Sequence, residues 1–313
     1  MQPELRAQVE RNIFPAARAA VEPWDDFKWH NESGICDTEK SHSSQALAID
    51  LFGTLRQAPQ EERDAILGAI AQRFALPPAG PWSVELEWED KENRLCESGK
   101  QSQVDALATS PLAVICFECK FTESDGGCCS QVLPISSGKH AGKKQCNGRY
   151  ELQVNPVKGT ERSRCALTAK RIRYWEVVPE VFRLDPGQDY APCPFKGPWY
   201  QWMRNLVLAH ELGLPEGRKS TFVVVYANDK DLPFPAVLST KQWKRLLGLV
   251  RSDKVGLHVM SFQEVLSLAR ERAGGTSAVW RDLEEWIRRK IRKAACSKGT
   301  PRVAGSSATR LYR

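Results

Sequence analysis

The stretch QVDALATSPLAVICFECKFTE, residues 103–123, decides the fold that we expect for this chain. Residues 112–117 form a short, uninterrupted apolar run, which is typical of a strand covered on both faces. The turn Thr109-Ser110-Pro111 separates this run from residues 103–108. Two adjoining strands joined by a proline-containing turn predict a β-hairpin.

Outside this hairpin, the hydrophobic periodicity predicts helices and strands in mixed order. Apolar residues alternate with glutamates over residues 84–89, which predicts a half-buried strand, and Ser43-Ser44 precede a helical run. The remaining expected elements are helices over residues 61–74, 200–212, 240–251, 262–272 and 278–295, and strands over residues 221–226 and 256–261. Because this order lacks a strict βα repeat, we expect an α/β domain with a small mixed β-sheet flanked by helices.

The domain organisation that we expect has three parts. Residues 1–42 read as a helical and irregular extension, residues 43–295 as the main domain, and residues 296–313 as a basic, disordered tail. Inside the main domain, residues 124–198 form a Cys-rich irregular insertion with little periodicity. An irregular segment of this length calls for a bound metal, a binding loop or disorder.

Composition narrows the class of protein. The 313 residues include 45 Lys and Arg against 38 Asp and Glu, a net charge of +7, with 42% hydrophobic residues. These values exclude collagen-like and wholly disordered chains, and no apolar run is long enough to cross a membrane. Residues 1–9 carry charges and no apolar core, so we expect no signal peptide, a cytoplasmic location and reduced thiols. The basic charge permits nucleic-acid binding without requiring it.

Three residues of the hairpin carry the chemistry. Glu118 and Lys120 project from the same face of their strand, because residues two apart share a face, and Asp105 lies on the neighbouring strand. Two carboxylates can clamp a divalent cation through the oxygen ligands that Mg²⁺ prefers. The lysine could orient or deprotonate a water, or stabilise negative charge on a phosphodiester under attack.

Asp105 and the triplet Glu118-Cys119-Lys120 resemble the motif of the PD-(D/E)xK nuclease superfamily, also called restriction-endonuclease-like. The surrounding segment, residues 103–123, resembles the bacterial restriction-type members of this superfamily. A proline before the aspartate is missing here. The resemblance implies a restriction-endonuclease-like core and a DNA endonuclease, a hydrolase dependent on Mg²⁺ or Mn²⁺. It also implies a further acidic metal ligand from an earlier element, for which Glu87 is our first choice, ahead of Glu85. Cleavage of a duplex by one active site per chain implies a homodimer or sequential nicking.

Other interpretations stay open at this point. Lys120 could form an ordinary surface ion pair with a neighbouring carboxylate. The chain could be a non-catalytic nucleic-acid-binding protein on the same fold, stabilised by a zinc or Fe–S site, although pure binding would not need an intact Asp/Glu/Lys set. It could also be a structural interaction protein held together by a metal, with the cysteines at its centre.

The expected helix over residues 200–212 is a candidate DNA-contacting element. Gln201 and Arg204 lie three residues apart and share one face with Asn205. This polar face could contact the phosphate backbone beside the metal site, or it could be the solvated side of an amphipathic helix.

A second metal site is possible in the insertion. Cys129, Cys146, Cys165 and Cys193 could assemble a four-thiolate site for Zn²⁺ or a 4Fe–4S cluster, although none belongs to a CxxC pair. They could equally be scattered small hydrophobic side chains. Cys116 and Cys119 have CxxC spacing, but on one strand they point to opposite faces.

Overall fold

A five-stranded mixed sheet forms the centre of the protein, which we describe from a computed structural model over residues 2–32, 35–274 and 278–298. Its strands are, in spatial order, β3 (Ser83–Glu89), β4 (Gln103–Thr109), β5 (Ala113–Lys120), β8 (Lys219–Tyr226) and β9 (Gly256–Ser261). β3, β4 and β5 are antiparallel neighbours, whereas β8 pairs with β5, and β9 with β8, in parallel. The expected α/β class with a small mixed sheet is confirmed.

The uninterrupted apolar run of β5 is explained by cores on both faces of the sheet. Ile115 and Phe117 point into one core, and Val114 and Cys116 into the other. All eight residues of β5 are buried, including Glu118 and Lys120 at its end. The hairpin predicted from residues 103–123 is present, with Ala106 opposite Phe117.

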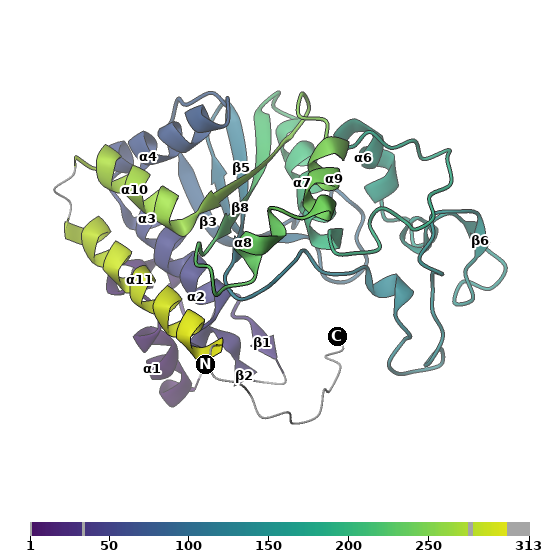
Figure 1. Ribbon diagram of the computed structural model, residues 1–313, viewed down its shortest axis with the longest axis horizontal. Helices are drawn as coiled ribbons and strands as arrows, with labels where there is room; N and C mark the ends of the chain where they lie inside the picture. The colour runs from purple at the N-terminus through teal and green to yellow at the C-terminus, as the bar shows by residue number, and fades with distance from the viewer. Residues whose placement is uncertain (1, 33–34, 275–277, 299–313) are drawn as a thin grey trace.

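Helices cover both faces of the sheet (Figure 1). One face packs against α2 (Ser44–Ala48), the π-helical turn η3 (Ile49–Gly53), α3 (Thr54–Gln57), α4 (Gln60–Arg73), α10 (Phe262–Arg272) and α11 (Ala278–Lys298). The N-terminal α1 (Pro3–Arg11) and η1 (Pro15–Val21) join this core through residues such as Val9 and Ala17. The other face packs against α5 (Ala166–Ala169), α6 (Tyr174–Val181), α7 (Tyr200–Gly213), α8 (Phe234–Val237) and α9 (Lys241–Leu249).

The helix after Ser43 is interrupted by a π-helical turn that the apolar pattern did not predict. Asp50, fully buried in this turn, accepts a hydrogen bond from the backbone N–H of Phe14 and pairs with Lys290 of α11. Gly53 lets η1 approach closely, because an added Cβ there would lie 3.0 Å from the Cβ of Ala17. Tertiary contacts therefore reshape the helix locally.

The segment over residues 124–198 is largely irregular, and Figure 1 shows it extending away from the sheet on the α6 and α7 side. Besides α5 and α6 it contains only short pieces in the structure: η4 (Ser130–Val132), β6 (Gln153–Val154) and β7 (Arg162–Ser163). The sequence did not predict α6, whose Pro179 disfavours helix.

The first forty residues contain three short elements that the sequence did not predict, namely β1 (Asn31–Glu32), β2 (Ile35–Cys36) and η2 (Asp37–Glu39). At the other end, α11 continues to Lys298, and the rest of the expected disordered tail lies outside the described residues. No helix in the described part of the chain is long and apolar enough to span a membrane.

Candidate active site

The sheet is irregular where Glu87 of β3 and Asp105 of β4 face each other. The flanking pairs, Leu86 with Ala106 and Trp88 with Val104, are in register. Leu86 and Ala106 pack into the core under α2, whereas Val104 belongs to the opposite core. Both strands thus change face between these pairs, and Glu87 has a φ of 47°, a left-handed conformation that is costly for a glutamate. The distortion places two carboxylates at the same point of the sheet.

At the end of β5, Glu118 and Lys120 share the face that is covered by α7. Lys120 Nζ donates hydrogen bonds to Glu118 Oε1 and to Gln201 Oε1, and each donor–acceptor distance is 3.0 Å. Gln201 Nε2 donates to Glu118 Oε1 over 2.6 Å, and Asn205 Nδ2 donates to Glu118 Oε2 over 3.1 Å. The polar face of α7 therefore lies beside the motif, as we expected. Gln201 contacts both Lys120 and Glu118, and Asn205, one helical turn later, contacts Glu118.

Asp105 lies next to this cluster on the adjacent strand. Its Oδ2 accepts a hydrogen bond from the backbone N–H of Cys119 over 2.6 Å. Burial, and then the negative charges of Glu118 and Glu87, raise the pKa of Asp105 well above its ordinary value. Three carboxylates held this close together repel one another, and a bound cation would relieve the repulsion.

His30 completes the group, although no pattern in the sequence indicates it. Its Nε2 lies 3.1 Å from Glu87 Oε2, which also accepts from Gln103 Nε2. The loop that carries His30 is held by Gln45 of α2, which accepts from the backbone N–H of His30 over 2.9 Å and donates to the carbonyl of Lys28 over 2.8 Å. Burial lowers the pKa of His30, but Glu87 outweighs it and raises the value to about 9.

The donor set suits a divalent cation. One ligand atom each from His30, Glu87 and Asp105 lie within 4.8 Å of one another. Glu87 Oε1 is buried and has no hydrogen-bond partner among the described residues, so a ligand would satisfy it. Carboxylates with one imidazole suit Mn²⁺ well, and Mg²⁺ through the oxygens. Glu118 is not part of this group, and amide and ammonium donors engage both of its oxygens.

A further carboxylate, Glu123, lies close to Lys120. Burial opposes the ionised form of Glu123, but Lys120 and a hydrogen bond from Ser44 outweigh it and lower its pKa. For Lys120, burial would lower the pKa, yet the charges of Glu118, Glu123 and Asp105 raise it above its ordinary value. Lys120 is therefore an ammonium group at neutral pH.

Arg204, the second residue of α7 that is a candidate for contacting DNA, pairs with a carboxylate of the protein. Its Nη2 lies 2.8 Å from Oε1 of the buried Glu97, which also binds the hydroxyl of Tyr174 and that of Ser102. The guanidinium therefore balances a buried carboxylate instead of facing Lys120. Glu85, the second choice for an acidic ligand, is exposed to solvent, in contrast to the buried Glu87.

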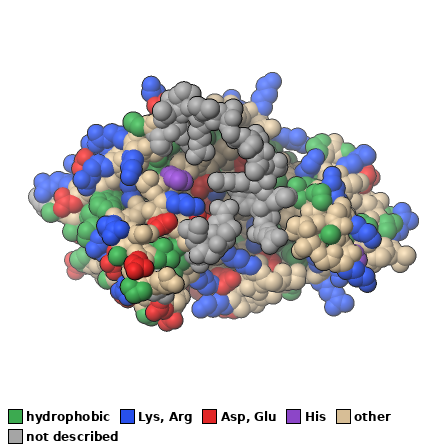
Figure 2. Space-filling model, turned by 90° about the horizontal axis from the view of Figure 1, so that it is seen from below, with side chains coloured by type: hydrophobic (Ala, Val, Ile, Leu, Met, Phe, Trp, Pro, Cys, Tyr) green, Lys and Arg blue, Asp and Glu red, His purple; other side chains and the backbone are tan. Residues whose placement is uncertain are grey.

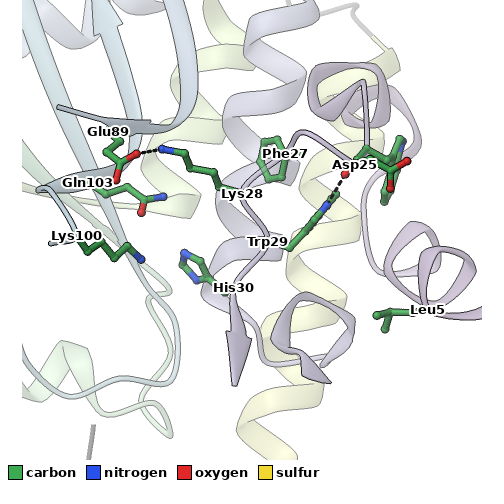
Figure 3. A pocket seen from close by; sticks show the side chains of 10 residues that line it. Leu5, Asp25, Phe27, Lys28, Trp29, His30, Glu89, Lys100 and Gln103 are labelled. Carbon is green, nitrogen blue, oxygen red and sulfur yellow. Dashed lines mark hydrogen bonds and ion pairs between the residues drawn. The ribbon is translucent and has the colours of Figure 1, made fainter. Parts of the chain in front are cut away.

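A pocket opens beside this site (Figure 3). Lys28, His30, Glu89, Lys100 and Gln103 line it, together with apolar and aromatic side chains. His30, Lys100 and Gln103 face its interior, and Lys28 pairs with Glu89 across it. Figure 2 shows one face of the molecule, on which Lys and Arg side chains are scattered with acidic side chains among them. The positive charge is thus distributed over this face.

Comparisons with known proteins identify one family. The family described as "Restriction Endonuclease associating with ARP" matches residues 5–287, which include all of the site residues described above. No curated protein and no solved structure matches the chain.

Proposed function

The chain belongs to the family of restriction endonucleases associating with ARP, and from this premise we propose that it is a Mg²⁺- or Mn²⁺-dependent DNA nuclease of the PD-(D/E)xK type. Family membership points to a nuclease with a role in restriction or defence, and to DNA as the substrate. The observation that carries the finer proposal is the convergence of Asp105, Glu118 and Lys120 at adjacent ends of β4 and β5, with Glu87 beside them.

In this proposal Asp105, Glu87 and His30 would hold the cation, and His30 would release its proton to solvent when the cation binds. When bound, the cation supplies a water nucleophile at neutral pH and neutralises charge on the attacked phosphodiester. Asp105 is fixed by the N–H of Cys119, and His30 by Gln45, so the ligands are held in place by neighbours that do not bind the cation.

Lys120 acts as a fixed positive charge beside the scissile phosphate. Because its pKa is raised, it serves as a hydrogen-bond donor to an anionic phosphate oxygen and not as a general base. Glu118 and Gln201 hold its ammonium group between them, so the side chain loses little freedom when the substrate arrives.

The pocket beside His30 supports DNA as the polymer that is bound. Lys100 lies at this pocket and is exposed, so it can contact a phosphate next to the one that is cleaved. Since the described part of the chain carries a single such site, we further propose that duplex cleavage requires a homodimer or two successive nicks.

The test compares cleavage of supercoiled plasmid and linear duplex DNA in EDTA, Mg²⁺ and Mn²⁺. We expect cleavage by the wild type only with metal, and a loss of at least about 10²-fold in Asp105→Asn and Lys120→Met. Glu85→Gln, which removes an exposed carboxylate from the same strand as Glu87, is the matched control and should cleave normally.

Equal cleavage by the wild type and both variants would refute the site. DNA binding by the wild type without cleavage under any of the metal conditions would favour the non-catalytic alternative.

A further inference from the structure

Four thiols in the segment over residues 124–198 come together in space although they are far apart in sequence. Cys129 precedes η4, Cys146 lies in a loop, Cys165 precedes α5, and Cys193 lies in the chain leading to α7. The charges that Cys146, Cys165 and Cys193 would carry as thiolates all act on the pKa of Cys129, so the four groups are electrostatic neighbours. All ten cysteines lie in the described part of the chain, and each is a free thiol there.

Backbone hydrogen bonds join three of these loops into a closed ring. The N–H of Cys129 donates to the carbonyl of Lys196 over 2.9 Å, and the N–H of Cys193 donates to the carbonyl of Gly148 over 3.0 Å. The N–H of Cys146 donates to the carbonyl of Gln131 over 2.9 Å. Each of the three loops thus carries one cysteine and holds the next loop. The fourth segment is attached through Lys170, whose Nζ donates to Gln131 Oε1 over 2.6 Å.

Backbone N–H groups two or three residues further along the chain lie close to the four sulfurs. Gly148 N lies 3.3 Å from Cys146 Sγ. Against the effect of burial, the N–H groups of Gln131, Thr168 and Phe195 act on Cys129, Cys165 and Cys193 respectively and lower the pKa of each thiol. Hydrogen bonds to sulfur favour the thiolate, which is the form that binds metals, and such outer contacts commonly orient metal ligands.

Without a metal, this environment is unfavourable for thiolates. All four thiols are partly buried, and burial without a counter-charge disfavours the thiolate form. A bound metal would supply that counter-charge. The positive charge of Lys170 acts on Cys129 and Cys165 and would offset the excess negative charge of four thiolates.

We propose that Cys129, Cys146, Cys165 and Cys193 bind one metal centre through four thiolates, either a single Zn²⁺ ion or a 4Fe–4S cluster. Four cysteine ligands are the ordinary complement of both. Zn–S bonds of about 2.3 Å would bring the four sulfurs to about 3.8 Å from one another. Among the described residues, three potential ligand atoms lie within 4.8 Å of one another only in the group at His30. No three of the four sulfurs therefore lie that close together. That spacing favours the larger cluster.

The centre would also support the candidate active site. The backbone N–H of Gly126 donates to the carbonyl of Pro198 over 2.8 Å, and that of Gln201 donates to the carbonyl of Gly126 over 2.7 Å. The chain next to Cys129 therefore runs beside the chain between Cys193 and α7. A metal that fixes these two segments would fix the start of α7 and hence the amide of Gln201. This link to activity rests on the proposed function, whereas the metal centre itself does not.

The experiment measures the metal content of the full-length protein, purified without oxygen and without chelators. We expect either iron and sulfide with the broad visible absorbance of a cluster, or one zinc ion per chain without colour. Cys129→Ser and Cys193→Ser should lose the metal. Cys128→Ser, which changes the exposed neighbouring thiol, is the matched control and should keep it.

Two further measurements keep the proposal open to refutation if the cysteine variants fold poorly. Reduced wild-type protein that is titrated with Co²⁺ should show intense thiolate-to-cobalt charge-transfer absorbance at one equivalent. Asp105→Asn should keep the metal centre, which separates this site from the proposed nuclease site. A purified protein with no iron, no zinc and no cobalt–thiolate absorbance would overturn the proposal, whatever its nuclease activity.

Discussion

The backbone N–H of Cys119 donates a hydrogen bond to Oδ2 of Asp105 over 2.6 Å, so the middle residue of the Glu118-Cys119-Lys120 triplet holds the aspartate of the neighbouring strand. This contact comes from the backbone, and the thiol points into the core on the far face of the sheet. We therefore expect Cys119→Ala to cleave DNA like the wild type while losing about 1 kcal/mol of stability from the smaller buried side chain.

The measurements for Cys119→Ala are denaturant unfolding and plasmid cleavage on the same preparation. A large loss of cleavage at unchanged stability would show that the thiol, and not the backbone, serves the site.

Gln201 bridges Lys120 and Glu118, since its amide accepts from one and donates to the other. Gln201→Leu keeps the volume but removes both contacts, so the ammonium group should lose its fixed position. We expect about a 10²-fold lower rate constant for cleavage with metal affinity unchanged. Single-turnover cleavage and Mn²⁺ titration measure the two quantities separately. Gln72→Leu, an exposed position on α4, is the control, and an equal rate loss there would contradict the assignment.

The hairpin and its three motif residues could be predicted from sequence because local rules decide them. A continuous apolar run between a turn and a charged triplet has few alternatives to a covered strand, and the two-residue spacing of Glu118 and Lys120 fixes their common face. The helical spacing of Gln201 and Asn205 placed them together for the same reason.

His30 as a site residue and the ion pair of Arg204 with Glu97 could not be predicted from sequence, because long-range contacts determine both. His30 reaches Glu87 only because Gln45, fifteen residues later, holds its loop. Arg204 turns to Glu97, which lies in an irregular loop whose course no periodicity reveals. The left-handed φ of Glu87 likewise breaks the alternation from which its strand was predicted.

Lys290 of α11 neutralises the charge of the fully buried Asp50. Its Nζ lies 2.5 Å from Asp50 Oδ2. Lys290→Met would leave this carboxylate buried without its cation, so we expect a loss of about 3–5 kcal/mol in the free energy of unfolding. Lys293→Met, at an exposed position of the same helix, should change the stability little. Denaturant unfolding measures both, and similar losses would contradict the role given to Lys290.

The same variant should show a characteristic pH dependence. Burial raises the pKa of Asp50 above its ordinary value even with Lys290 present, and removal of the lysine would raise it further. In the window between the unfolded and the raised folded pKa, the native state binds more protons than the unfolded state, so its stability increases as the pH falls. The deficit of Lys290→Met relative to the wild type should therefore shrink as the pH is lowered from neutral toward the ordinary range of aspartate. A constant deficit would indicate that Asp50 is not the cause.

Lys100 lines the pocket beside His30 and is exposed. If it contacts a phosphate, Lys100→Ala should weaken DNA binding in EDTA and reduce the slope of log K against log salt by about 1. The control is Lys91→Ala, an exposed lysine that does not line this pocket. Fluorescence anisotropy over a series of salt concentrations measures the slope. Equal slopes for the two variants would show that Lys100 does not contact a DNA phosphate.

Glu87 holds one buried oxygen that has no hydrogen-bond partner in the described part of the chain, while its other oxygen contacts His30 and Gln103. If that free oxygen is a cation ligand, Glu87→Gln should weaken Mn²⁺ binding by about 10–100-fold, since the amide keeps the shape but loses the charge. Glu85→Gln on the same strand should bind Mn²⁺ normally because its side chain is exposed. Calorimetric titration without DNA gives both affinities. Unchanged affinity in Glu87→Gln, with lost affinity in Asp105→Asn and Glu118→Gln, would move the metal from the β3 side of the site to the pair formed by β4 and β5.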